Sequence, residues 1–151
     1  MRYFEDFTVG LTEEFGQYSM TETEIIEFAT EFDPQFFHTD PEAAKGHFFG
    51  GLIASGWHTA SAMMRMIADH QYKDAPSMGS SGLDELRWIS PVRPGEVLSV
   101  KSVVLEATPH PRKNDRGFVK FKHTVVNEKD EVKLTMVSNV LFGTNPDKRE
   151  G

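Results

Sequence analysis

Asp33 and His38 are the residues whose types and spacing most directly suggest acid–base chemistry. They are five positions apart in the stretch DPQFFHTDPEAAK, which separates two segments of helical character. A carboxylate and an imidazole that share a site can exchange a proton with a substrate near neutral pH. Spacing alone does not bring the two side chains together. The alternative interpretation is that Asp33 simply ends a helix and that His38 is an ordinary loop histidine.

A second candidate feature is the glycine-rich segment that leads from Gly50 and Gly51 into a helix starting near Ser55. The first turn of a helix has unpaired N–H groups and the positive end of the helix dipole, so it favours negative charge. Gly56 has no side chain, and a ligand carbonyl could therefore approach its N–H closely. This is the layout of an oxyanion hole. The alternative is that these glycines only permit tight packing.

Three helices are predicted in the first half of the chain. The first covers residues 21–32, because Thr21 and Glu24 form a capping-box pattern and apolar residues follow at helical spacing. The Asp-Pro pair that follows ends this helix, since the residue before a proline is pushed out of the helical region. A short second helix is expected to begin near Asp40 and to end at Gly46.

The third helix, predicted over residues 55–70, has few charges and is expected to be mostly buried. Its apolar face is predicted to consist of Trp57, Ala60, Met63, Met64 and Ile67. A narrow polar stripe of His58, Arg65 and Asp69 is expected on another face, and it is a candidate subunit contact.

The second half of the chain is typical of β-strands. The predicted strands cover 82–90, 96–108, 118–127 and 131–142, with a further strand possible at 12–20. Short connections, including the polar loop 109–117, make the sheet antiparallel, and residues 131–142 alternate between two faces. One such sheet beside one buried helix predicts an α+β fold in which the sheet wraps the helix. We expect a single domain over residues 1–151, with a flexible tail from about 145.

Composition excludes several classes of function. The 151 residues include no cysteine, so disulfides, thiolate metal sites and cysteine nucleophiles are excluded. The net charge of −7 argues against a nucleic-acid partner. No apolar run approaches the ~20 residues of a membrane helix, and the N-terminus does not resemble a signal peptide, so no membrane partner and a cytoplasmic location are expected. His47 and His58 fit no compact zinc pattern, and we expect no metal.

The span FDPQFFHTDPEAAKGHFFGGLIASGWH, residues 32–58, resembles the signature of the MaoC-like dehydratases. These include the (R)-specific enoyl-CoA hydratases of the hotdog superfamily. The family signature reads Asp-x-Asn-Pro-x-His-x-Asp-Pro, then a short helix, a Gly-rich loop and a small residue followed by Gly. The segment GLDELRWISPVRPGEVL also resembles the family's strand–turn–strand. The resemblance implies a hotdog fold, a long antiparallel sheet wrapped around a central α-helix.

The resemblance also implies a reaction and a set of site residues. Asp33 and His38 would be the catalytic dyad and Gly56 the oxyanion donor in reversible syn addition of water to a trans-2-enoyl-CoA, giving a (3R)-3-hydroxyacyl-CoA. Substrate-binding residues are expected at Gln35, Phe37, Phe49, Gly51 and Ser55. No cofactor is expected, since coenzyme A is part of the substrate, and the protein is expected to form a homodimer or a dimer-based oligomer.

The sequence departs from the family pattern at four positions, and other functions stay open. Gln35 replaces Asn, Phe36 replaces Pro, Ser55 replaces a common His, and Met64 replaces a hydroxyl residue of some members. One alternative function is a hotdog acyl-CoA thioesterase, and another is a non-catalytic acyl-thioester-binding subunit. Candidate contacts to the phosphates of coenzyme A are Arg87, Arg93 and Arg112.

Overall fold

The structure is a computed structural model that describes residues 1–149. In chain order, its elements are the short 3-10 helix η1 (Phe4–Asp6), β1 (Thr12–Ser19), α1 (Glu22–Phe32), α2 (Phe36–Thr39), α3 (Pro41–Ala44), α4 (Gly56–His70), β2 (Ser77–Trp88), β3 (Val97–Pro109), β4 (Arg116–Val126), β5 (Val132–Gly143) and the 3-10 helix η2 (Pro146–Lys148). The predicted helices and strands are therefore confirmed, and the structure adds the single turn α2.

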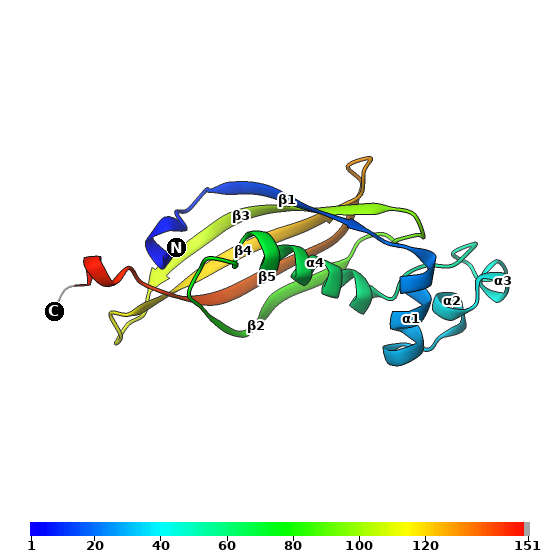
Figure 1. Ribbon diagram of the computed structural model, residues 1–151, viewed down its shortest axis with the longest axis horizontal. Coiled ribbons are helices and arrows are strands. Elements are labelled where there is room, and N and C mark those ends of the chain that lie inside the picture. Colours follow the sequence, from blue (N-terminus) through cyan, green and yellow to red (C-terminus); the bar gives the residue numbers. More distant parts are fainter. Residues whose placement is uncertain (150–151) are drawn as a thin grey trace.

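The five strands form one antiparallel sheet in the order β1-β3-β4-β5-β2. Helix α4 lies along one face of this curved sheet (Figure 1). Helices α1, α2 and α3 gather at one end of the molecule, and the N-terminus and η2 lie toward the other end (Figure 1). The predicted α+β class, with a long sheet wrapped around a central helix, is confirmed.

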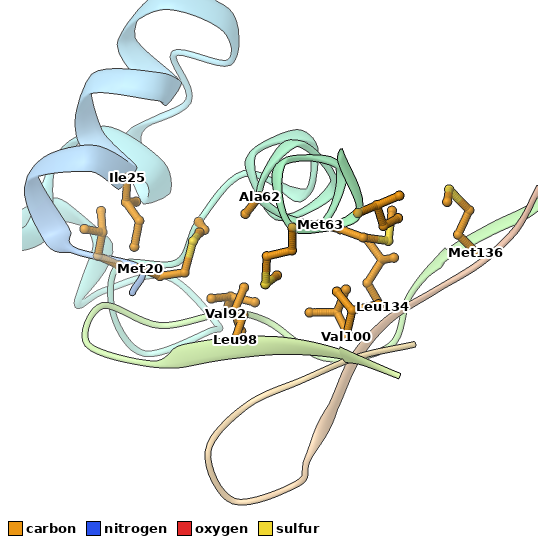
Figure 2. Close-up of a cluster of buried hydrophobic side chains, with 14 of the residues drawn as sticks. Met20, Ile25, Ala62, Met63, Val92, Leu98, Val100, Leu134 and Met136 are labelled. Carbon is orange, nitrogen blue, oxygen red and sulfur yellow. The ribbon is translucent and has the colours of Figure 1, made fainter. Parts of the chain in front are cut away.

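The main core lies between α4 and the sheet. Met63 of α4 packs in one buried cluster with Leu98 and Val100 of β3 and with Leu134 of β5, and Ile25 of α1 belongs to the same cluster (Figure 2). Full burial of such side chains stabilises the fold by about 1.5–3 kcal/mol each. This packing fixes α4 against the sheet and thereby sets where the first turn of α4 lies.

The predicted apolar face of α4 is partly wrong. The buried residues of the helix are His58, Thr59, Ala62, Met63, Met66 and Ile67. Trp57 is 58% exposed, whereas His58, predicted in the polar stripe, is only 2% exposed. The reason is that α1 covers this side of the first turn, where Phe28 stacks on His58 with ring centroids 4.7 Å apart. His58 is therefore not a surface contact, while Arg65 and Asp69 form an exposed ion pair of 2.8 Å.

Strand β2 starts at Ser77, earlier than the predicted residue 82, and it forms one edge of the sheet. Its first residues are Ser and Gly rather than typical strand formers, and its pairing with β5 is irregular at three places. Most of β2 is exposed, including Met78 and Leu83. Pairing with β5, rather than local propensity, holds this segment extended.

Residues 145–149, predicted to belong to a flexible tail, are bonded to the rest of the protein. The backbone N–H of Asn145 donates to the carboxylate of Glu5 at 2.9 Å, and the guanidinium of Arg149 donates to the Thr144 carbonyl at 2.9 Å. The remainder of the predicted tail, residues 150–151, lies outside the described residues. Within residues 1–149, no helix is both long enough and apolar enough to cross a membrane.

Candidate active site

The junction between α1 and α2 brings a carboxylate and an imidazole together. Asp33 is the C-cap of α1, and Pro34 prevents that helix from continuing. The chain then forms the single turn α2, which carries His38. The distance between Asp33 Oδ2 and His38 Nε2 is 3.3 Å, and the His38 side chain is almost fully buried. The five-residue spacing noted in the sequence thus corresponds to direct contact.

The hydrogen bond made by His38 Nδ1 shows which of the two ring nitrogens is available for chemistry. Nδ1 lies 2.8 Å from the carbonyl oxygen of Ile53. A carbonyl only accepts hydrogen bonds, so Nδ1 must carry the hydrogen. Nε2, facing Asp33, is therefore the nitrogen that gains or loses a proton, and the bond to Ile53 fixes the orientation of the ring.

Two hydrogen bonds and the neighbouring His38 keep Asp33 ionised. Partial burial raises the pKa of Asp33, but hydrogen bonds from Gln35 and Ser55, together with the nearby His38, lower it further and leave it below its ordinary value. Gln35 Nε2 donates to Oδ1 and Ser55 Oγ donates to Oδ2, each at 2.7 Å. Asp33 is therefore a carboxylate at neutral pH that can accept a proton or a hydrogen bond.

The start of α4 adds a backbone donor to the same region. Ser55 is the N-cap of α4, and its hydroxyl accepts a hydrogen bond from the Trp57 N–H at 3.3 Å. Gly56 is the first residue of the helix, and its N–H donates no hydrogen bond to any group within residues 1–149. A free N–H at a helix start can bind an oxygen that carries negative charge.

A cavity of about 370 Å³ joins these groups. Its size lies in the usual range for small-molecule sites, about 300–1,000 Å³. Its lining contains Asp33, His38, Phe37, Phe49 and Gly56, all expected at the site, together with mostly apolar residues from α4 and from the segment 88–92. An apolar cavity with one acid–base pair and one backbone donor suits an apolar group attached to a polarisable carbonyl.

Three of the expected substrate-binding residues do not line the cavity. Gln35 hydrogen-bonds to Asp33 instead, and Ser55 is completely buried and also bonded to Asp33. Gly51 lies beside Arg93, whose Nη1 would be 3.5 Å from a Cβ added at this glycine. Gln35 and Ser55 thus orient the carboxylate rather than facing the cavity.

Trp88 is the main cavity residue that sequence analysis did not single out. It is the last residue of β2, and its indole N–H donates to the Gly56 carbonyl at 2.7 Å. Trp57, which was assigned to the buried face of α4, also lines the cavity and makes an edge contact with Trp88. The position of Trp88 just before a proline-containing turn was visible in the sequence, but nothing local connects it to Gly56.

The comparison with known families agrees with the signature in residues 32–58. A family model described as "MaoC like domain" matches residues 8–127. The chain belongs to the MaoC-like domain family. The match includes Asp33, His38 and the start of α4. The fold of the chain described here is the hotdog fold that the resemblance implies.

Individual relatives support this assignment to different degrees. A crystal structure described as a MaoC-like dehydratase from Rhodospirillum rubrum has 37% sequence identity and a TM-score of 0.91, covering 97% of this chain and 99% of that chain. The protein YdeM from Bacillus subtilis (strain 168) is 28% identical over 86% of this chain and 90% of its own length. The R-hydratase PhaJ1 from Pseudomonas aeruginosa has a TM-score of 0.77 at 22% identity, covering 95% and 86% of the two chains, and shares the fold.

Proposed function

We propose that this MaoC-like protein catalyses the reversible addition of water to a trans-2-enoyl thioester, giving a (3R)-3-hydroxyacyl thioester. The observation that carries the proposal is the placement of Asp33, His38 and the free Gly56 N–H around one apolar cavity. An acid–base pair alone would serve many reactions. Its combination with a donor for a carbonyl oxygen specifically suits a substrate whose double bond is conjugated to that carbonyl.

In the hydration direction, Asp33 and His38 together hold one water molecule. As the water oxygen forms a bond to C3, Asp33 accepts one of its protons, and the electron pair of the C2–C3 double bond shifts toward the thioester oxygen. The Gly56 N–H stabilises the negative charge that develops on that oxygen. The acid–base pair then returns a proton to C2, so that one water is added in total and nothing is oxidised or reduced.

A substrate bearing coenzyme A requires a cation near the opening of the cavity. Arg93 is the best placed of the three candidates, because its guanidinium donates to the Phe49 carbonyl at 2.5 Å and it forms no ion pair within residues 1–149. Arg87 is already paired with Glu85. Arg112 belongs to the β3–β4 connection, which lies near the C-terminal end of the described chain. We therefore propose that Arg93 binds a phosphate of coenzyme A.

The exposed edge strand supports a proposed homodimer. Strand β2 has unpaired backbone groups along its outer side, and Met78 and Leu83 are about half exposed. Exposed edges of this kind pair readily with another strand. A second copy that covers β2 would bury this edge, and sedimentation velocity measurements test the expected dimer.

Crotonyl-CoA distinguishes the proposed hydratase from its alternatives. We expect loss of the enoyl absorbance without release of free thiol. Release of thiol would indicate a thioesterase instead. Quenching of tryptophan fluorescence without any turnover would indicate a non-catalytic binding protein, since both tryptophans of the chain, Trp57 and Trp88, line the cavity.

A further inference from the structure

We infer that Trp88 is a positioning residue for the Gly56 N–H, and this inference rests on the proposed function. Trp88 ends β2, an edge strand that is distant in sequence from α4. Its side chain nevertheless lies against the first residue of α4. The groups that receive the substrate carbonyl are thus held from two directions, by α4 itself and by the sheet.

Two observations define the contact. The indole Nε1 donates a hydrogen bond to the Gly56 carbonyl oxygen at 2.7 Å. A Cβ added to Gly56 would lie 2.5 Å from Nε1 and 2.6 Å from Cε2 of the same indole. The ring of Trp88 therefore lies directly against the Gly56 Cα, at a distance that only glycine permits.

This contact matters because Gly56 has the least restricted backbone of any residue type and lies where helical hydrogen bonds do not yet constrain its N–H. The peptide group that follows it is held at both ends. Its carbonyl accepts from Trp88, and its N–H, that of Trp57, donates to Ser55 Oγ at 3.3 Å. Fixing this peptide limits rotation at Gly56 and so limits the direction in which the preceding N–H points.

Trp57 provides an internal comparison. Its ring lies 5.1 Å from that of Trp88 at 78° and lines the same cavity. Within the described part of the chain, however, the Trp57 indole makes no hydrogen bond to Gly56. Replacing either indole by phenyl removes similar bulk from the cavity wall, but only Trp88→Phe removes a donor to the Gly56 carbonyl.

The test compares Trp88→Phe with Trp57→Phe by two measurements. The first is steady-state hydration of crotonyl-CoA, and the second is the ¹⁵N relaxation order parameter of the Gly56 amide without substrate. For Trp88→Phe we expect KM to change to a similar extent as for Trp57→Phe and kcat to fall roughly fivefold or more below the kcat of Trp57→Phe, because the affected donor acts mainly on charge that develops in the transition state. The Gly56 order parameter is expected to fall as well. Trp57→Phe is expected to alter KM and to leave the Gly56 order parameter as in the wild type.

A Trp88→Phe protein with wild-type kcat and an equally ordered Gly56 amide would overturn the inference, even if the protein is a hydratase. The absence of hydration by the wild type would instead overturn the proposed function, while the relaxation measurement still tests the positioning role. If Trp88→Phe does not fold, the contact between Trp88 and Gly56 is tested by NMR measurements on the wild-type protein. One Gly56 Hα is expected to show an upfield ring-current shift and a nuclear Overhauser effect to the Trp88 indole N–H, and the absence of both would overturn the inference.

Discussion

The hydroxyl of Ser55 donates a hydrogen bond of 2.7 Å to Oδ2 of Asp33 and so joins the N-cap of α4 to the C-cap of α1. The same hydroxyl accepts a hydrogen bond from the Trp57 N–H in the first turn of α4. One buried side chain thus connects the carboxylate beside His38 to the helix start that presents the Gly56 N–H. The acid–base pair and the backbone donor are thus linked by direct contact, in addition to the contact that Trp88 of β2 makes with Gly56.

Ser55→Ala is expected to raise the pKa of Asp33, because the lost hydrogen bond is one of the interactions that lower it. The acid limb of the pH profile of kcat/KM should therefore move to higher pH. Loss of the N-cap should also cost about 1 kcal/mol of folding stability, measured by denaturant unfolding. Ser55→Thr retains a hydroxyl and serves as the control. An unchanged acid limb in Ser55→Ala would contradict the role assigned to this bond.

Asp33→Asn keeps the size and one acceptor oxygen of the side chain but removes its charge and basicity. Turnover of crotonyl-CoA is expected to fall by about 10²–10⁴ with the fold preserved, which circular dichroism can verify. Asp40→Asn is a matched control, because Asp40 caps α3 through bonds to the Glu42 and Ala43 N–H groups, and Asn caps equally well. Full activity of a folded Asp33→Asn protein would rule out Asp33 as the base.

Gly56→Ala is expected to displace Trp88, because the new Cβ would lie 2.5 Å from the indole Nε1. We expect the tryptophan emission to shift toward that of a more exposed indole and kcat to fall by about 10-fold or more, as the Gly56 N–H loses its direction. Gly46→Ala is the control, since the nearest atom would be 3.8 Å away. If Gly56→Ala and Gly46→Ala have equal activity and emission, the close approach of Trp88 to Gly56 is not important for function.

Arg93→Ala is expected to raise KM for crotonyl-CoA by roughly threefold to tenfold and to weaken the dependence of KM on salt, as a charge-assisted contact to phosphate is lost. The value of kcat should change little. Arg112→Ala removes the same charge from the β3–β4 connection and should leave KM unaffected. Equal KM values for the wild type and Arg93→Ala would require another residue to bind the phosphate.

Stability is expected to fall on acidification because of His123. This residue is fully buried, and its Nε2 lies 2.7 Å from Gln71 Oε1, while its Nδ1 has no partner within residues 1–149. Burial lowers its pKa from 6.5 to about 4, against a smaller opposing effect of Glu13. The unfolded chain therefore binds a proton at higher pH than the folded protein does. Full stability is present above about pH 6.5, and on the order of 3 kcal/mol is lost as the pH falls toward 4.

Denaturant unfolding at several pH values measures this loss, and His123→Gln is the comparison. The variant cannot take up a proton at this position and should show a shallower dependence of unfolding free energy on pH. Some dependence should persist, because burial also lowers the pKa of His58, against the opposing effect of Glu24. An identical slope in the wild type and in His123→Gln would show that His123 is not the titrating group.

The helix boundaries around the site were predictable because they depend on neighbouring residues. Thr21 caps α1, with its hydroxyl accepting from the Glu24 N–H at 3.2 Å, and Pro34 places Asp33 at the end of that helix. Of the capping-box pattern at Thr21 and Glu24, only the hydrogen bond to the Thr21 side chain forms. The Glu24 side chain does not complete the capping box but interacts with Tyr18 and His58. The Glu24 carboxylate therefore binds side chains of β1 and α4 rather than the backbone of its own helix.

The sequence by itself determined the types of chemical group, the order of the elements and the signature in residues 32–58, because caps, prolines and apolar periodicity act over a few residues. Tertiary structure alone decided that His58 is buried against Phe28, that Ser55 bonds to Asp33 and that Trp88 covers Gly56. The last of these contacts spans 32 residues of chain. Such contacts arise only when the sheet, α1 and α4 pack around a common core, because packing, and not local preference, chooses which distant side chains share a site.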